Sequence, residues 1–270
     1  MPHHHAIRAV FALSITLASF AVAPARAELS ESLVVLKEAP GASPGALAPA
    51  PALPADAICF TEYTGDALTD FSSFDAQAVR DALAAVPDGG TIRIAGTCAG
   101  TSFQNGAFQL GLVTKTVTLI GGYTTIWTTS DPIANPTTLD ALGGGRVIYA
   151  FAPMTLSALS LINGSIGAGN DGGGVYANGD LTLIDTQFFS NTAGSKGGGF
   201  VAFGAVTLNG GLFQNNRSTS DNGAGLYSYD ALTVSGTQFI SNTAGNVGGG
   251  LYAAAALTLS NSVLISNVAS

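Results

Sequence analysis

Histidine and cysteine, which serve as catalytic bases, thiol nucleophiles and zinc ligands, are scarce in this chain. The only histidines are His3, His4 and His5, and the only cysteines are Cys59 and Cys98. A Ser-His-Asp or Cys-His site needs a histidine beside the nucleophile, and a structural zinc site needs four suitable ligands. All three histidines lie within the predicted signal peptide described below, so the mature chain would have none. This argues against serine and cysteine hydrolases and against zinc enzymes.

Carboxylates are the remaining candidates for catalysis. Polysaccharide lyases and glycosidases use acids, an arginine or lysine base, or bound calcium. The carboxylates of the repeat region described below are Asp180, Asp185, Asp221 and Asp230. They occupy different positions in their repeat units, so we expect them not to cluster. A carbohydrate-active enzyme, with the insertion around Trp127 forming part of its cleft, stays as the alternative to a protein without catalysis.

Two glycine-rich stretches resemble ligand-binding loops. The segment "GAGND" at 167–171 partly matches a calcium-binding nonapeptide, which holds ions between tandem repeats, but it occurs once. The segment "GGGVYANG" has no helix after it, as a phosphate-binding loop would. Both are better explained as turns, and we predict no cofactor and no metal.

The N-terminal segment, 1–27, has the pattern of a secretory signal peptide. Arg8 precedes the apolar run "AVFALSITLASFAVA", and "ARA" ends at Ala27 with the small residues that signal peptidase requires. A run of about 15 residues is shorter than the ~20 of a membrane-spanning helix. We therefore predict a secreted or cell-surface protein whose mature chain lacks both histidine and a transmembrane helix.

The predicted export bears on the state of the two cysteines. Disulfides persist outside the cytoplasm, so we predict a Cys59–Cys98 bridge, with two unpaired buried cysteines as the alternative.

The chain carries 17 acids against nine bases, a formal net charge of −8. This charge disfavours binding to nucleic acid and to anionic membrane surfaces.

The segment between the signal peptide and the repeats divides into a linker and a cap. Residues 28–57 are rich in alanine and proline and predict an extended linker. Residues 58–90 predict an N-terminal cap, in which Ser73 or Asp75 begins a short helix that ends at Pro87. A strand is expected from Thr91.

The second half of the chain is a repeat. Glycine triplets, with Gly-Ala-Gly in the third unit, recur at an almost constant spacing and begin at Gly172, Gly197, Gly223 and Gly248. An asparagine follows each of these glycines at one fixed distance, at Asn191, Asn216, Asn242 and Asn267. Fixed positions at a fixed period are typical of repeat architectures in which each unit stacks on the next.

The pattern within each unit predicts strands. Segments such as "LTL" and "VTL" alternate aliphatic residues with threonine, and three short strands fit in a unit. A unit of this length cannot bury its own apolar face but can stack on an identical neighbour about 4.8 Å away. We therefore predict an all-β protein, a parallel β-helix with about 25 residues per coil, over residues 91–270 with regular repeats from 172.

The repeated glycines and asparagines are predicted to turn the chain. Glycine permits positive φ where one coil leads to the next. Asparagine tolerates the left-handed conformation at the other corner, and its amide can hydrogen-bond the equivalent amides above and below.

One row of side chains is a candidate binding surface. If Val175 and its equivalents face inward, their neighbours face outward in a line that contains Tyr176, Tyr227 and Tyr252. Stacked aromatic residues on a flat sheet can bind a surface glycan or a protein partner. The alternative is the reverse parity, in which these tyrosines belong to the core.

The repeats resemble those of chlamydial-type polymorphic outer membrane proteins. The shared features are a GGA-aliphatic motif, here "GGGV", "GGGF", "GAGL" and "GGGL", and an FxxN motif, here "FFSN", "FQNN" and "FISN", with "LISN" in the last unit. The helix-then-strand entry is similar to the N-terminal cap of pectate-lyase-like proteins. This resemblance implies a right-handed β-helix at the cell surface that serves as an adhesin or an autotransporter passenger.

The last expectation concerns residues after the final asparagine. Nothing there resembles a cap, so the β-helix is predicted to be incomplete at its C-terminus, where Leu251, Leu257, Leu259 and Leu264 would be left open. End-to-end self-association or further coils would cover that surface.

Overall fold

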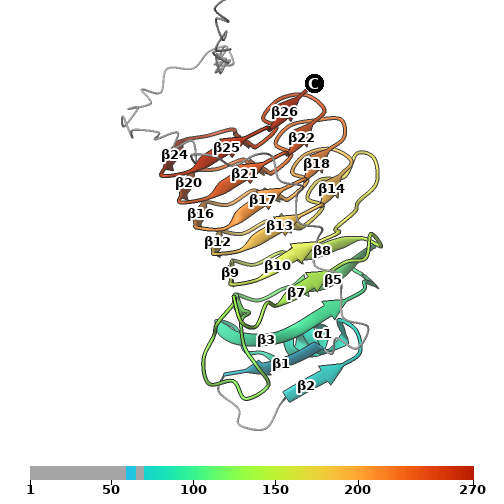
Figure 1. The fold of residues 1–270 in the computed structure, drawn as a ribbon. Helices are drawn as coiled ribbons and strands as arrows, with labels where there is room; N and C mark the ends of the chain where they lie inside the picture. The colour runs from blue at the N-terminus through green and yellow to red at the C-terminus, as the bar shows by residue number, and fades with distance from the viewer. Residues whose placement is uncertain (1–58, 65–69) are drawn as a thin grey trace, which may run out of the picture.

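The chain folds as a parallel β-helix of about seven turns, as the repeat predicts, and the helix is right-handed, as the resemblance implies. The computed structural model describes residues 59–64 and 70–270, so the predicted signal peptide and linker lie outside the described residues. The turns are stacked from the cap around helix α1 (Gln77–Ala85) to the strands nearest residue 270 (Figure 1). Strands of one turn pair in parallel with the equivalent strands of the next.

Two sheets form adjacent walls of the β-helix and share strand β3. Sheet A consists of β3 (Gly90–Ala99), β6 (Val117–Ile120), β9 (Met154–Ser157), β12 (Leu181–Ile184), β16 (Val206–Asn209), β20 (Leu232–Ser235) and β24 (Leu257–Ser260). Sheet B contains the end of β3 with β7 (Thr138–Asp140), β10 (Ser160–Ile162), β13 (Gln187–Phe189), β17 (Leu212–Gln214), β21 (Gln238–Ile240) and β25 (Val263–Ile265).

A third wall and a short fourth sheet complete each regular turn. Sheet C consists of β4 (Ser102–Gln104), β5 (Ala107–Val113), β8 (Arg146–Ala150), β11 (Val175–Ala177), β15 (Phe200–Ala202), β19 (Leu226–Ser228) and β23 (Leu251–Ala253). Sheet D consists of β14 (Thr192–Ala193), β18 (Arg217–Ser218), β22 (Thr243–Ala244) and β26 (Val268–Ala269). The prediction of three strands per unit is therefore wrong by one, because such short strands show no alternation.

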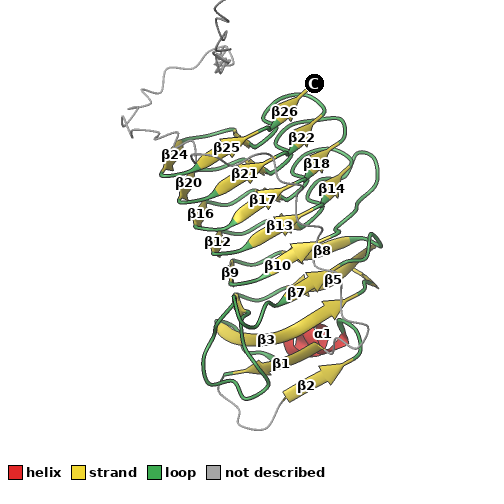
Figure 2. Cartoon of the chain, viewed as in Figure 1, coloured by secondary structure: helices red, strands yellow, loops and turns green. Residues whose placement is uncertain are grey.

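Apart from the short helix of the cap, the described chain consists of strands and the loops that join them (Figure 2). Strand alternation places one aliphatic row of each wall in a continuous core. Phe188, Phe213 and Phe239 stack on one another there, with ring centroids 4.7 and 5.0 Å apart. All three side chains are fully buried. Identical residues lie over one another because the parallel register pairs equivalent positions of successive turns.

The repeated asparagines form a buried ladder inside the turn after sheet B. The Nδ2 of Asn191 donates to Oδ1 of Asn216 at 3.0 Å, and the Nδ2 of Asn216 donates to Oδ1 of Asn242 at 2.9 Å. Asn267 ends the ladder, accepting from Nδ2 of Asn242 at 2.8 Å. The ladder gives buried polar groups the partners that they need in an apolar interior.

The expected left-handed conformation at these asparagines is wrong. Positive φ occurs instead at the residue before each asparagine, with values of 54–56° at Ser190, Asn215, Ser241 and Ser266. The asparagine side chain must point inward to reach its neighbours, so the residue before it makes the turn. The first glycine of each triplet does have positive φ, between 66° and 71° at Gly172, Gly197, Gly223 and Gly248.

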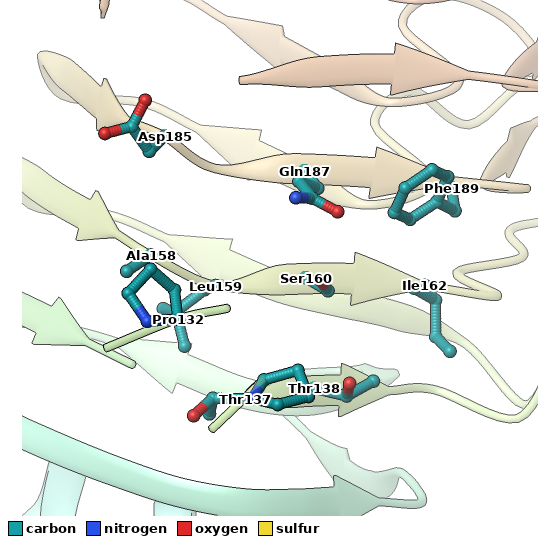
Figure 3. Close-up of a pocket in the computed structure, with 11 residues that line it drawn as sticks. Pro132, Thr137, Thr138, Ala158, Leu159, Ser160, Ile162, Asp185, Gln187 and Phe189 are labelled. Atoms are coloured by element: carbon teal, nitrogen blue, oxygen red, sulfur yellow. The ribbon is translucent and has the colours of Figure 1, made fainter. Parts of the chain in front are cut away.

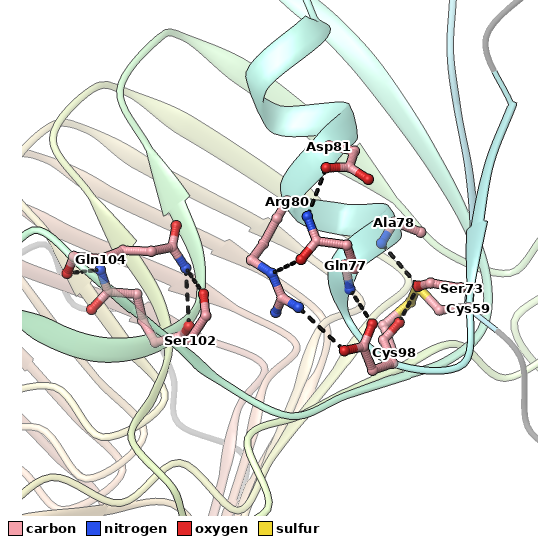
Figure 4. A network of polar contacts seen from close by, with 11 residues as sticks. Cys59, Ser73, Gln77, Ala78, Arg80, Asp81, Cys98, Ser102 and Gln104 are labelled. Carbon is pink, nitrogen blue, oxygen red and sulfur yellow. Dashed lines mark hydrogen bonds and ion pairs between the residues drawn. A yellow bond between two sulfur atoms is a disulfide. The ribbon is translucent and has the colours of Figure 1, made fainter.

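The N-terminal end is closed by α1 and an antiparallel pair, β1 (Cys59–Tyr63) and β2 (Asp70–Ser73) (Figure 1). Polar contacts hold the start of α1 in place (Figure 4). Ser73 Oγ accepts a hydrogen bond from the backbone N–H of Ala78 at 2.9 Å, and Asp75 Oδ1 accepts from that of Gln77 at 2.7 Å. The N-cap position itself is occupied by Ala76 instead of either predicted residue, but both predicted side chains satisfy donors in the first turn of the helix.

The predicted disulfide is confirmed. Cys59 and Cys98 are bonded, and both are fully buried between β1 and β3. Because β1 also pairs with β3 over Cys59–Tyr63, the bridge fixes one end of an antiparallel ladder.

At the opposite end, the last turn is more exposed than the turns beneath it. Strands β23 to β26 each pair on one side within the described chain. Leu257, Ile265 and Val268 are 43%, 50% and 51% exposed. Leu232, which occupies the position of Leu257 one turn earlier, is 1% exposed. End-to-end association of two copies through this surface stays a prediction.

Candidate functional site

Seven aromatic rings run in an unbroken series over the outer face of sheet C, and we call them the aromatic ridge. In order of contact they are Phe151, Tyr149, Tyr176, Phe203, Tyr229, Tyr227 and Tyr252. Neighbouring ring centroids are 4.4–5.3 Å apart. The ridge crosses five successive strands, β8 to β23, a span of about 19 Å at the usual strand spacing.

Strand alternation puts the ridge outside the core. Val175, Phe200 and Leu226 have no exposed surface and belong to the core cluster, so their successors along each strand face outward. Tyr176 and Tyr252 are partly exposed, whereas Tyr227 is 6% exposed because other ridge rings and Lys196 lie against it.

The three sequence-predicted tyrosines do not form one column by themselves. Val201 occupies the position between Tyr176 and Tyr227 in the paired register. Phe203, two positions after Val201, bridges the gap by contacting Tyr176 at 5.3 Å and Tyr229 at 4.4 Å. The ridge therefore uses two outward columns of the same face.

The sequence analysis did not identify the second column of the ridge, nor Tyr149 at the start of the first column. Phe151, Phe203 and Tyr229 each lie two positions after the column of predicted tyrosines, and Tyr149 belongs to the irregular turn before the repeats. The period of two along a strand was the signal that could have found them, because alternate residues share a face.

Arg146 secures the first half of the ridge. Its side chain is 5% exposed, and its guanidinium lies 5.0 Å from the ring of Tyr149 and 5.2 Å from that of Tyr176. Nε and Nη2 donate to the backbone oxygens of Gly172 and Asp171, each at 2.8 Å. Burial lowers the pKa of Arg146 from its ordinary value, and the neighbouring tyrosines and Asp171 oppose this change.

Lys196 packs against the second half of the ridge. Its Nζ lies 5.7 Å from the centroid of the Tyr227 ring and 2.9 Å from Oδ2 of Asp221. The hydrogen bond with Asp221 raises the pKa of Lys196. Burial, followed by the proximity of Tyr229 and Tyr252, raises the pKa of Tyr227 to about 12.

Six of the seven rings in the ridge have at least one face against a stacked ring or a cation. Phe203 and Tyr229 are stacked at an interplanar angle of 14°, and Tyr227 and Tyr252 at 17°. Phe151 and Phe203 are the most exposed apolar members, at 44% and 37%. The ridge therefore offers ring edges, tyrosine hydroxyls and two phenyl side chains to a partner.

A second feature is the insertion that contains Trp127. Residues 121–137 leave the β-helix between β6 and β7 and fold against the outer face of sheet B. Arg93 holds this insertion, because its Nη1 donates to the backbone oxygen of Trp127 at 3.2 Å and to Oε2 of Glu62 at 3.1 Å. Pro132 and Pro136 of the insertion line a cavity of about 180 Å³.

The carboxylates considered for catalysis make separate contacts. Asp180 accepts from the backbone N–H of Ala205 and Asp230 from that of Ala231, while Asp221 pairs with Lys196. Asp185 lines the cavity beside the insertion. Within the described residues, no three histidine, cysteine, aspartate or glutamate side chains lie close enough to hold a metal ion.

Residues 59–64 and 70–270 contain no helix long and apolar enough to cross a membrane. In comparisons with known proteins, no family model, curated protein or solved structure matches the chain.

Proposed function

We propose that this protein is an exported, non-enzymatic surface protein that binds a protein partner through the aromatic ridge, in the manner of an adhesin or an autotransporter passenger. The observation that carries the proposal is the ridge itself, an ordered aromatic series of about 19 Å on an outer wall. Aromatic side chains dominate the energetics of protein interfaces because each buries a large area for few rotatable bonds.

The stacking within the ridge favours a protein over a glycan as the partner. Sugar recognition by aromatic residues uses an open ring face, whereas six of the seven rings here have a face covered by a stacked ring, Arg146 or Lys196. Edges and hydroxyls suit the mixed apolar and polar surface of a protein. The two cations also order the rings before binding, which lowers the entropic cost of association.

The disulfide and the repeat pattern support the surface location. The Cys59–Cys98 bond is compatible with an extracytoplasmic protein, because such bonds persist in oxidising compartments. The resemblance of the repeats to those of chlamydial-type polymorphic outer membrane proteins points the same way.

Binding to the surface proteins of intact cells tests this proposal. The full chain should bind, and the Phe203→Ala variant should bind at least tenfold more weakly because Phe203 joins the two halves of the ridge. Phe103→Ala removes an exposed phenylalanine of β4, outside the ridge, and should bind like the parent chain. Equal binding by all three proteins, or binding that survives protease treatment of the cells, would contradict the proposal.

A carbohydrate-active enzyme is the second candidate, and the cavity beside residues 121–137 is the observation in its favour. Glycosidases use a pair of carboxylates about 5–9.5 Å apart, but Asp185 is the single carboxylate in the cavity lining. Incubation of the chain with pectin, alginate and chondroitin separates the candidates, because an enzyme would release unsaturated or reducing-end products.

A further inference from the structure

The cavity beside the 121–137 insertion lies on a different wall from the aromatic ridge. Its floor is the outer face of sheet B, formed by β7, β10 and β13 (Figure 3). One side is formed by Pro132 and Pro136, and the turn from sheet A to sheet B contributes Ala158, Leu159 and Asp185. At about 180 Å³ it is smaller than the roughly 300–1,000 Å³ of sites for drug-sized ligands, so it suits a single ring-sized group.

The floor carries polar groups in a regular column. Thr138, Ser160 and Gln187 occupy paired positions on successive strands, so their side chains are about 4.8 Å apart. Within the described residues, the hydroxyl of Ser160 and the side-chain amide of Gln187 make no hydrogen bond with another residue. They are available to a ligand that has several hydroxyl groups at similar spacing.

Beside this column lies an apolar one. Ile162 and Phe189 are paired in register on β10 and β13, two positions after Ser160 and Gln187. Phe189 is partly exposed, and among the described residues no other aromatic ring stacks on it, in contrast to the aromatic ridge. A phenyl ring next to hydroxyl and amide groups matches a pyranose, which has an apolar face of C–H groups and a polar rim.

The insertion is fixed in place before any ligand binds. Gly122 donates its N–H to Oγ1 of Thr137 at 2.9 Å, and Asp131 donates its N–H to the backbone oxygen of Gly122 at 2.7 Å. The carboxylate of Asp131 in turn accepts from the N–H groups of Ile133 and Ala134 at 3.1 and 3.0 Å. The proline side of the cavity is therefore preorganised, which favours the binding of small ligands.

The charge of the lining limits the class of sugar. Asp185 is the only ionisable residue among those that line the cavity. A uronate or a sulfated sugar would bring a negative charge toward this carboxylate without a cation to balance it, which is unfavourable. A neutral sugar meets no such cost.

We propose that this cavity binds a neutral pyranose unit of an uncharged polysaccharide without cleaving it. This site goes beyond the proposed function and does not depend on the aromatic ridge. One pyranose makes few contacts, so the dissociation constant is expected to be on the order of millimolar for a monosaccharide. Adjacent units of a chain would extend along sheet B.

Saturation-transfer NMR with the full chain tests the proposal. The probes are the methyl glycosides of glucose, mannose, galactose and xylose, with glucuronate and galacturonate as anionic counterparts. At least one neutral glycoside should bind, and both uronates should bind at least tenfold more weakly. Gln187→Ala and Phe189→Ala should each weaken binding of the neutral sugar at least fivefold.

Two variants serve as matched controls. Gln238→Ala removes the same side chain from the same column of sheet B two turns farther on, outside the cavity, and should bind sugar like the parent chain. Phe203→Ala, which tests the ridge, should also leave sugar binding unchanged. Far-UV circular dichroism and thermal melting confirm that each variant is folded.

Three outcomes would overturn the proposal. The first is that no neutral glycoside binds at a sugar concentration about 20-fold above the expected millimolar dissociation constant. The second is that the uronates bind more tightly than the neutral glycosides. The third is that Gln187→Ala and Gln238→Ala have equal effects on sugar binding. Because Phe203 lies on another wall, loss of sugar binding and loss of partner binding are separable, so either proposal can fail while the other stands.

Discussion

Removal of one central rung of the asparagine ladder should destabilise the whole β-helix. Asn216 is 1% exposed, and its side chain makes four hydrogen bonds: it accepts from the backbone N–H and Nδ2 of Asn191 at 3.1 and 3.0 Å, and donates to Asn242 Oδ1 and to the backbone oxygen of Phe188, each at 2.9 Å. The Asn216→Ala variant leaves these buried partners short of a hydrogen bond.

The magnitude follows from the number of partners. At about 1 kcal/mol for each lost hydrogen bond in a buried setting, the loss in the free energy of unfolding is about 4 kcal/mol. The end rung gives the comparison, because Asn267 makes three such bonds and is partly open to water. Water replaces its lost bonds, so Asn267→Ala should cost about 1 kcal/mol.

Equilibrium unfolding in urea, followed by far-UV circular dichroism, measures both values. Asn209→Ala on the exposed face of sheet A is the control for loss of an asparagine, and it should change the free energy of unfolding by less than about 0.5 kcal/mol. A cost for Asn216→Ala no larger than that for Asn267→Ala would refute the reasoning, since the ladder would then not depend on burial.

Three further predictions concern other elements. Gly199→Ala should lower the free energy of unfolding by more than about 2 kcal/mol, because the new Cβ would clash with the backbone oxygen of Gly225 in the next turn. Gly167→Ala is the control and should be neutral in the same urea assay, because a Cβ at Gly167 meets nothing within 4 Å. Replacing Cys59 and Cys98 by serine should lower the free energy of unfolding by about 4 kcal/mol on the loop-entropy model. Hydrogen exchange should show the loss of protection first in β1 and α1. Unchanged exchange in these two elements would contradict the model. In a spectrophotometric titration, one tyrosine should ionise near pH 12, and Tyr227→Phe should remove that step. The raised pKa means that the folded protein favours the neutral phenol of Tyr227. The stability that this contributes is fully present below about pH 10 and is lost as the pH rises toward 12. A melting temperature that rises over this range would contradict the assignment.

The repeat in the sequence determined most of the fold. A unit of fixed length places equivalent residues in register on successive turns, so the nearly constant period of the glycine triplets implies parallel pairing without knowledge of any long-range contact. The disulfide was predictable for a related reason, because the chain has two cysteines and the export pattern implies an oxidising compartment. The asparagine ladder followed from identical residues at identical positions.

The tertiary structure decided the features that depend on contacts between residues at different positions of the repeat, namely the ring contacts of the ridge, the cavity and the left-handed corner. Phe203 contacts Tyr176 and Tyr229 from a second column, and the order of ring contacts is set by rotamers that no spacing reveals. The cavity arises because Pro132 and Pro136 return against β10 and β13, which lie farther along the chain and belong to later turns. The left-handed corner fell on the residue before each asparagine because the amide must point inward to meet its neighbours. Spacing along the chain determines which equivalent residues pair, whereas the packing of non-equivalent side chains is set by the folded surface alone.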